Sequence, residues 1–196
     1  MIYLLRHGEI EEQANRRYIG QTNCALSKRG RAQADFWKKR LKGEGIASIF
    51  CSDLSRSTDT AKIIANGRQV AVRIDPDLGE INLGDWDGQL MQDIRTEYPA
   101  EWAKRGEHID TFRPPRGESF ADLYQRVIPV FEHIAENSSG SVVIVGLAGV
   151  NRMVLCHLLG LPIGNLFSIQ QDYGAINLID NSKHDLQVVA VNIRTL

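Results

Sequence analysis

Apolar and polar positions divide the chain into short apolar runs and longer amphipathic stretches. The apolar, β-favouring runs at 2–5, 46–51 and 141–145 predict buried strands. The stretches 28–42 and 118–136 place apolar residues on one face at helical spacing and predict amphipathic helices. By the same criteria, the sequence predicts further strands at 70–74, 175–180 and 186–193, and further helices at 56–66, 89–98, 100–107 and 150–159.

Strands that alternate with helices in this order predict an α/β fold. We expect a three-layer sandwich, in which a mostly parallel central sheet carries helices on both faces. A polar turn at 181–182 separates the last two predicted strands and indicates a C-terminal antiparallel hairpin. The length of 196 residues predicts a single domain over 1–196. Within it, the segment at about 89–116 is predicted to be a helical insertion over one end of the sheet.

Capping residues, prolines and glycines set the predicted boundaries. Ser27 is placed as the N-cap of the helix over 28–42. Glu118 or Ser119 begins the later long helix, and Pro129 marks the point at which a kink is expected. The glycine-punctuated stretch 78–88 predicts a loop, in which Trp86 is expected to pack against the protein.

Composition and charge narrow the function classes. The net charge of −1, from 23 basic and 24 acidic residues, gives no overall field that would attract nucleic acid or an anionic membrane. A site for an anion must therefore be local. Three cysteines without CxxC spacing indicate reduced thiols in a cytoplasmic protein, not disulfides or a zinc site. The start of the sequence does not resemble a signal peptide, and no apolar run is long enough to span a bilayer.

Candidate chemistry lies where the predicted strands end. Arg6 and His7 follow the first apolar run, Arg56 follows the second, and Glu80 lies in the glycine-rich loop. Because strand ends of one sheet converge, we expect Arg6, His7 and Arg56 to face one pocket. Two guanidiniums suit a phosphoryl group, since each presents a planar fork of donors. A neutral imidazole between them can attack phosphorus, and a carboxyl such as Glu80 can protonate the leaving oxygen.

Several motifs around these residues occur in a recognisable order. They are LRHGE at 5–9, a glycine at 20, the run from Leu26-Ser27 to Gln33-Ala34, the stretch SDL…R…TA at 52–61, and the loop from Glu80 to GDWDG at 84–88. Together they resemble the histidine phosphatase superfamily, the phosphoglycerate-mutase-like enzymes. The resemblance covers nearly the whole chain and implies an α/β sandwich and a phosphohistidine intermediate.

The resemblance also implies roles for individual residues. His7 would be the nucleophile, Arg6 and Arg56 would hold the phosphoryl oxygens, and Glu80 would donate a proton to the leaving group. In addition, Gly20 would line the pocket. The substrate-binding set further includes Gln13, at a position where many members have an asparagine that contacts phosphate.

The chain departs from the family pattern after its later strand. Members have a second histidine in a segment like HGGVxR, whereas this chain reads LAGVNR, with Leu147 in the histidine position and Ala148 beside it. Both positions are assigned to the substrate-binding surface. Leucine cannot donate a hydrogen bond to a phosphoryl oxygen, and loss of one such donor costs about 10²–10³ in rate. We therefore predict low or no activity, with phosphate or a phospho-ligand still bound. The otherwise complete site favours a single substitution of an active phosphatase over a natural pseudoenzyme.

Other polar candidates are assigned structural positions. His157 is expected to pack or cap within its helix, whereas Arg152 is equally compatible with a helix surface and with an anchor behind the site. Surface positions are expected for His108, His133 and His184, and for Arg113 and Arg116 in the connector.

The expected partner is a small-molecule phosphomonoester. The compact chain favours a phosphatase over a dedicated phosphoglycerate mutase, and the segment 167–177 resembles α-ribazole phosphatases, which implies α-ribazole 5′-phosphate as substrate. Alternatives are a broad small-molecule phosphatase, a mutase, and a catalytically dead protein that binds a phospho-ligand. No cofactor or metal is implied, since basic residues supply the charge and the sequence shows no carboxylate cluster. The sequence leaves the oligomeric state open.

Overall fold

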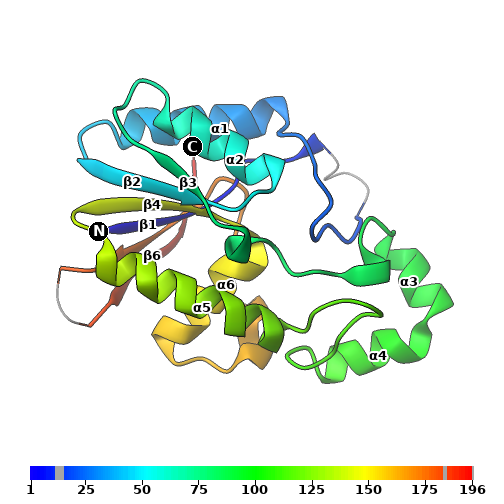
Figure 1. Ribbon diagram of the computed structural model, residues 1–196. Coiled ribbons are helices and arrows are strands. Elements are labelled where there is room, and N and C mark those ends of the chain that lie inside the picture. The colour runs from blue at the N-terminus through cyan, green and yellow to red at the C-terminus, as the bar shows by residue number, and fades with distance from the viewer. Residues whose placement is uncertain (12–15, 183–184, 196) are drawn as a thin grey trace.

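The computed structural model describes residues 1–11, 16–182 and 185–195. Its centre is a six-stranded sheet in the order β3-β2-β4-β1-β5-β6 (Figure 1). Neighbouring strands from β3 to β1 are parallel, whereas β5 and β6 pair antiparallel. This confirms the predicted mostly parallel sheet and the C-terminal hairpin. The strands are β1 (Ile2–Arg6), β2 (Ile46–Cys51), β3 (Val72–Ile74), β4 (Ser141–Gly146), β5 (Ile176–Asp180) and β6 (Gln187–Ile193).

Helices cover both faces of the sheet, as the sequence predicts. One face carries α1 and α2, and the other carries α5 and α6 (Figure 1). Short 3₁₀ turns at Pro76–Leu78, Gly84–Trp86 and Ile163–Ser168 lie within the connections. The helices are α1 (Lys28–Arg40), α2 (Ser55–Ala65), α3 (Met91–Glu97), α4 (Pro99–Glu107), α5 (Phe120–Asn137) and α6 (Ala148–Leu159).

The central strands divide their apolar side chains between two cores. In β1, Ile2 and Leu4 belong to the core on the side of α5 and α6, whereas Tyr3 and Leu5 belong to the core on the side of α1 and α2. Successive side chains of a strand point to opposite faces, so a strand with helices on both sides needs an unbroken apolar run. This requirement explains the pattern from which the sandwich was predicted.

Side-chain caps fix the starts of two helices. The Ser27 hydroxyl accepts a hydrogen bond from the Gly30 amide at 3.0 Å and caps α1. A reciprocal capping box begins α5, in which Ser119 and Asp122 each accept from the other's backbone amide, at 3.1 and 2.9 Å. Pro129 lies inside α5 without ending it.

The predicted boundary of β3 is two residues too early, because only 72–74 pair with β2 at the edge of the sheet. An edge strand is held from one side only, so its length depends on its neighbour more than on its own apolar run.

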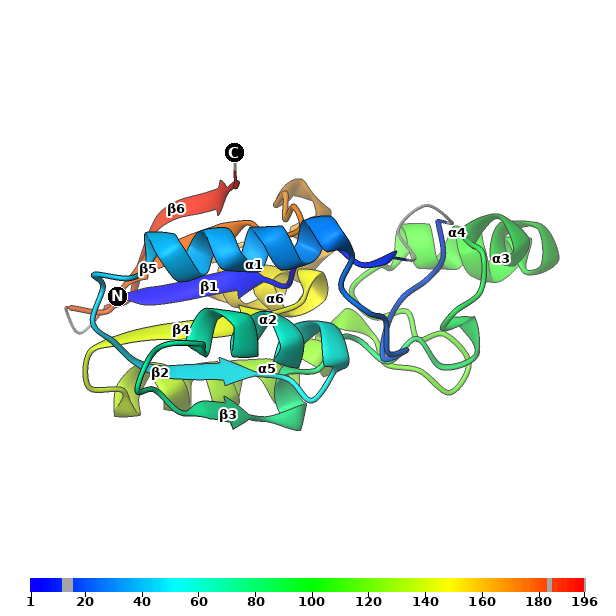
Figure 2. The same cartoon turned by 90° about the horizontal axis from the view of Figure 1, so that it is seen from above.

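The segment with α3 and α4 projects from one end of the sandwich, the end toward which β1 and β2 run (Figure 2). Pro99 occupies the first turn of α4. Amides in the first turn have no partner within the helix, so proline's lack of an amide hydrogen costs no helical hydrogen bond there. Trp86, before α3, is 1% exposed and packs in the core, as predicted. Across the described ranges, no helix combines the length and apolar character that crossing a membrane requires.

Candidate active site

Parallel pairing brings the ends of β1 and β4 together. The amide of His7, just past β1, donates to the carbonyl of Gly146 at the end of β4, at 3.1 Å. The amide of the next residue, Gly8, donates to the Thr60 hydroxyl on α2 at 3.1 Å. A Cβ at Gly8 would lie 2.3 Å from the carbonyl oxygen of Gly30, so this close approach requires glycine.

The His7 ring is 3% exposed and held in one tautomer. Its Nδ1 lies 2.7 Å from the Gly8 carbonyl oxygen, which can only accept, so Nδ1 carries the proton. Burial lowers the pKa of His7 well below its usual value, and the charges of Arg6 and Arg56 lower it further. The imidazole is therefore neutral, and Nε2 carries the free lone pair that a nucleophile needs.

Arg6 lies between the sheet and the loop before β5. Its Nη1 donates to the Gln171 carbonyl at 2.6 Å, and its guanidinium carbon lies 3.6 Å from the centre of the Tyr173 ring. The Nε atom is buried and, among the described residues, has no hydrogen-bond partner. Tyr173 also packs edge-on against His7, with ring centres 5.5 Å apart. Arg6 thus has unused donor capacity beside the histidine.

Arg56, near the start of α2, is 1% exposed and binds the loop that follows β1. Its Nη1 donates to the carbonyl of Thr22 at 2.7 Å, and its Nη2 donates to that of Gly20 at 2.5 Å. Burial lowers the pKa of Arg56, while the charge of Glu80 acts in the opposite direction. With five N–H donors, the guanidinium retains some for a ligand after these two bonds.

Glu80 is 7% exposed, and both carboxylate oxygens are held by backbone amides. Oε1 accepts from the Ile81 amide and Oε2 from the Gly149 amide, each at 3.0 Å. A Cβ at Gly149 would lie 2.2 Å from Oε1, so a side chain there would displace the carboxylate. The start of α6 and the loop before Gly84 thereby position this group together.

A cavity of about 350 Å³ connects several of these groups. Its lining includes Arg6, Glu80, Ala148 and Arg152, whereas His7 and Arg56 are not part of it. Arg152 donates its Nε to the Ile169 carbonyl at 3.0 Å. Burial lowers the pKa of Arg6, and the charge of Arg152 lowers it further. The charges of Arg6 and Arg56 both act on His7, so the fold brings two guanidiniums near the imidazole. Two guanidiniums beside a neutral imidazole can bind a phosphate ester and accept its phosphoryl group on the ring nitrogen.

Two further residues of the predicted substrate-binding set, Gly20 and Leu147, lie among the described residues. Gly20 lies behind Arg56, and its amide donates to Asp87 at 2.9 Å. Leu147 follows β4 directly, is fully buried, and belongs to the apolar core on the side of α5 and α6. Gln13 lies outside the described residues.

Sequence reasoning missed the groups that support the site. Gln171 and Tyr173 hold Arg6 from a loop more than 160 positions away in sequence. They lie in the segment 167–177, whose resemblance to α-ribazole phosphatases indicated a substrate but no contact with Arg6. Thr60 belongs to the stretch SDL…R…TA, which predicts no role for it, yet its hydroxyl accepts from the Gly8 amide and donates to the Arg56 carbonyl at 2.8 Å. Its place one helical turn after Arg56 is the one available signal.

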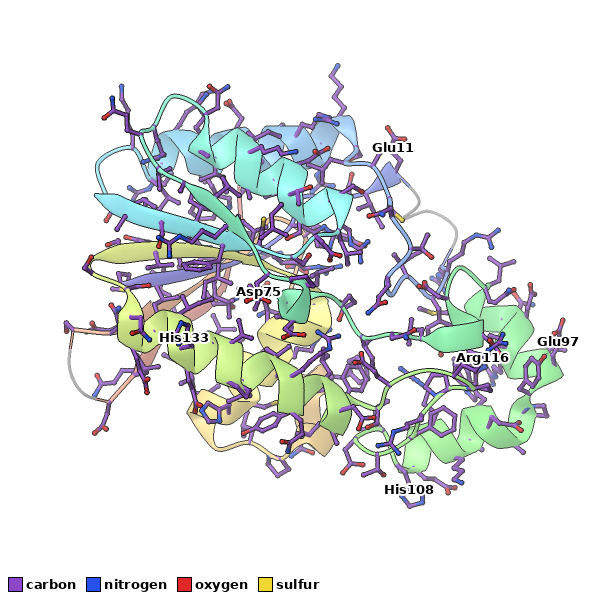
Figure 3. All side chains as sticks on the ribbon, viewed as in Figure 1. Glu11, Asp75, Glu97, His108, Arg116 and His133 are labelled. Carbon is purple, nitrogen blue, oxygen red and sulfur yellow. The ribbon has the colours of Figure 1, made fainter. Side chains whose placement is uncertain are left out.

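The three other histidines that the structure describes, His108, His133 and His157, lie away from these groups. The Nδ1 of His157 lies 2.7 Å from the Tyr124 hydroxyl, and its Nε2 lies 3.1 Å from Glu132, so it packs within the helical layer. Figure 3 shows His133 on α5 and His108 at the end of α4, and both are exposed. His184 is outside the described residues.

Two connector arginines pair with carboxylates on the protein itself. Arg113 contacts Asp122 through Nε at 2.5 Å, and Arg116 pairs with Asp85. Across the part of the chain that the structure describes, no three histidine, cysteine or carboxylate residues form a cluster that could hold a metal.

Comparison with known proteins gives the same family over almost the full length. The adenosylcobalamin/alpha-ribazole phosphatase of Escherichia coli K12 is 28% identical over 200 aligned residues, covering 100% of this chain and 97% of its relative. A Yersinia enterocolitica protein named "Probable phosphoglycerate mutase GpmB" is 34% identical to this chain. The alignment covers 82% of this chain and 75% of that protein.

Solved structures agree with these matches. The alpha-ribazole phosphatase of Shigella flexneri superimposes with a TM-score of 0.91 and 26% identity, covering 100% of this chain and 97% of that one. The sequence also matches the histidine phosphatase superfamily (branch 1) over residues 2–194. The chain therefore belongs to the histidine phosphatase superfamily.

Proposed function

We propose that the chain is built as a phosphomonoesterase that acts through a phosphohistidine. In the first step, Nε2 of His7 attacks phosphorus, and the bond from phosphorus to the leaving oxygen breaks. Glu80, in its protonated form, gives its proton to that oxygen, while Arg6 and Arg56 offset the charge on the phosphoryl oxygens. A water then attacks the phosphorus, the Nε2–P bond breaks, and Glu80 recovers its proton from that water.

One observation carries this proposal: the His7 imidazole has its proton fixed on Nδ1, leaving the Nε2 lone pair free beside two guanidiniums. Packing alone does not explain two positive charges beside a buried imidazole, because they make protonation of the ring unfavourable and add nothing to its apolar contacts. For a nucleophile that must stay neutral next to an anion, the same environment is an advantage.

Leu147 is proposed to impair this activity. It stands at the position of the family's second histidine, directly after β4, and its side chain offers no donor. Loss of one donor to the developing charge costs about 10²–10³ in rate. Its burial in the apolar core agrees with the view that residue 147 contributes nothing polar to the site. The chain would then bind a phospho-ligand and turn it over slowly or not at all.

The proposed substrate is α-ribazole 5′-phosphate, which would yield α-ribazole and phosphate. Full-length similarity to the Escherichia coli and Shigella flexneri phosphatases supports it. The GpmB relative supports a second candidate, a phosphoglycerate mutase or a broad small-molecule phosphatase. The leucine at 147 supports a third, a phospho-ligand binding protein without turnover.

The decisive experiment restores the histidine. We expect Leu147→His to raise hydrolysis of α-ribazole 5′-phosphate by at least about 100-fold, since one charged donor is regained. Leu147→Met is the matched control, because it changes the side chain without adding a donor, and it should leave the rate low. If Leu147→His raises the rate no more than Leu147→Met does, the proposed cause of impairment is wrong. If the restored enzyme turns over sugar phosphates equally well, α-ribazole 5′-phosphate is not its specific substrate.

A further inference from the structure

The active-site cavity is lined by charged and by aromatic side chains. Arg6 and Glu80, where the phosphoryl group would lie, belong to this lining, together with Arg16, Arg17 and Arg105. The aromatic residues Tyr18, Phe120 and Phe167 line the same cavity. A ligand whose phosphoryl group is held at Arg6 can therefore also contact an aromatic ring.

Phe167 is unusual among these aromatic residues because it is 54% exposed. It lies in the 3₁₀ turn Ile163–Ser168 and meets Phe120 edge-to-face, with ring centres 5.8 Å apart and planes at 87°. Phe120 itself is 6% exposed, so it fixes its neighbour from the side of the core. The result is a ring that is held in place yet has free surface on the cavity.

Arg152 supports the same ring. Its guanidinium carbon lies over Phe167, 5.2 Å from the ring centre, and the bond from Nε to the Ile169 carbonyl fixes its orientation. Within the described residues, no carboxylate lies within ion-pair distance of this guanidinium. A fixed guanidinium beside an exposed aromatic ring is a surface on which a flat π-system stacks.

We propose that Phe167, supported by Phe120 and Arg152, binds a planar aromatic ring in the leaving group of the substrate. This inference rests on the proposed phosphatase function, since the ring site matters only if the phosphoryl group is held at His7. It adds to the proposed substrate the residue on which the base of an aromatic riboside phosphate, such as a benzimidazole or a purine, would stack. A sugar phosphate without a base would bind through its phosphoryl group and leave Phe167 uncovered.

The test compares two ligands that share ribose and phosphate. Isothermal titration calorimetry on the full chain with its Leu147 measures binding of α-ribazole 5′-phosphate and of ribose 5-phosphate. Stacking of one base on an aromatic side chain predicts about tenfold tighter binding of the ligand that carries the base. Phe167→Ala should abolish this preference while leaving ribose 5-phosphate affinity unchanged, and Phe167→Tyr should keep it.

Val189→Ala is the matched control, because Val189 is 58% exposed on β6 and lies outside the cavity. It should keep the tenfold preference. Equal affinity of the two ligands, or a preference that survives in Phe167→Ala, would overturn the ring site and leave the phosphate site standing. Absence of binding by both ligands would overturn the ring site and the proposed function together.

Discussion

Replacing Arg126 with methionine tests how the loop with Glu80 is held in place. Arg126 lies on α5, and its Nη1 donates to the carbonyls of Asp77 and Gly79 at 2.7 and 2.9 Å. Its Nη2 donates to the Glu80 carbonyl at 3.0 Å, and its Nε to the Glu118 carboxylate at 2.9 Å. One side chain thereby fixes the backbone that presents the proposed proton donor.

The magnitude follows from burial. The side chains of Arg126 and Glu118 are 20% and 24% exposed. Methionine keeps most of the apolar stem but removes the cation from Glu118 and the side-chain donor from the carbonyls of Asp77 and Gly79. The Glu118 carboxylate keeps the Asn82 amide at 2.8 Å, and the Glu80 carbonyl keeps the Gln21 side-chain amide at 3.3 Å. Removal of one partner from a buried pair costs about 3–5 kcal/mol, and the residual exposure places this pair near the lower limit. A loss of about 3 kcal/mol lowers the urea midpoint by at least about 1 M.

Urea unfolding, followed by circular dichroism, measures this shift. Arg113→Met is the matched control, because Arg113 also forms a forked pair with a carboxylate, that of Asp122, but is 64% exposed. An exposed pair contributes about 0–1 kcal/mol, so this midpoint should move little. Equal shifts for the two variants would refute the reasoning that Arg126 anchors the Glu80 loop.

The remaining predictions concern Gly149, His7 and the buried thiol of Cys51. Gly149→Ala, made in the Leu147→His protein, places a Cβ 2.2 Å from Glu80 Oε1. Because a general acid contributes a factor of about 10²–10⁴ to the rate, its displacement should lower phosphatase activity at least about tenfold. Unchanged kinetics would contradict the contact between residue 149 and Glu80. The His7 ring should remain neutral in NMR titrations at pH 6.5, where an ordinary imidazole is half protonated. Because the pKa of His7 is lower in the folded than in the unfolded chain, the unfolded chain binds more protons at low pH. The free energy of unfolding should therefore fall as pH drops below about 6.5, and it should fall less in the His7→Asn variant. Identical pH profiles of the two proteins would contradict this. Burial raises the pKa of Cys51 to about 11, so iodoacetamide should leave it unmodified at pH 8 until the chain unfolds, and rapid labelling of native protein would contradict its burial.

Local patterns in the sequence were sufficient to predict the layers of the fold and the residues that follow the strand ends. The apolar run at 2–5 predicts β1 because a strand between two helical layers is buried on both faces, and Ser27 predicts the start of α1 because its hydroxyl caps it. Arg6 follows β1 and Glu80 lies in the loop after β3, and both line one cavity near the edge where the parallel strands end. His7 and Arg56 are not part of that lining, although the charge of Arg56 acts on His7.

The supporting contacts could not be predicted in this way. Tyr173 stacks on Arg6, and Arg126 holds the Glu80 loop, through pairings between segments far apart in sequence. These contacts depend on how helices and loops pack, and no periodicity encodes them. The effect of Leu147 on the rate could not be predicted in this way either. The sequence shows that the histidine is absent, but the size of the effect depends on which groups a histidine at 147 would contact.

The most direct measurement asks where the phosphoryl group is bound during turnover. Leu147→His protein is mixed with α-ribazole 5′-phosphate, quenched in alkali to preserve phosphoramidate bonds, and its peptides are analysed by mass spectrometry. We predict a phosphoryl group on His7. The double variant Leu147→His with His7→Ala should give no phosphorylated peptide and no turnover. Phosphate release that persists without His7, or a phosphoryl group on another residue, would contradict the central role of this imidazole.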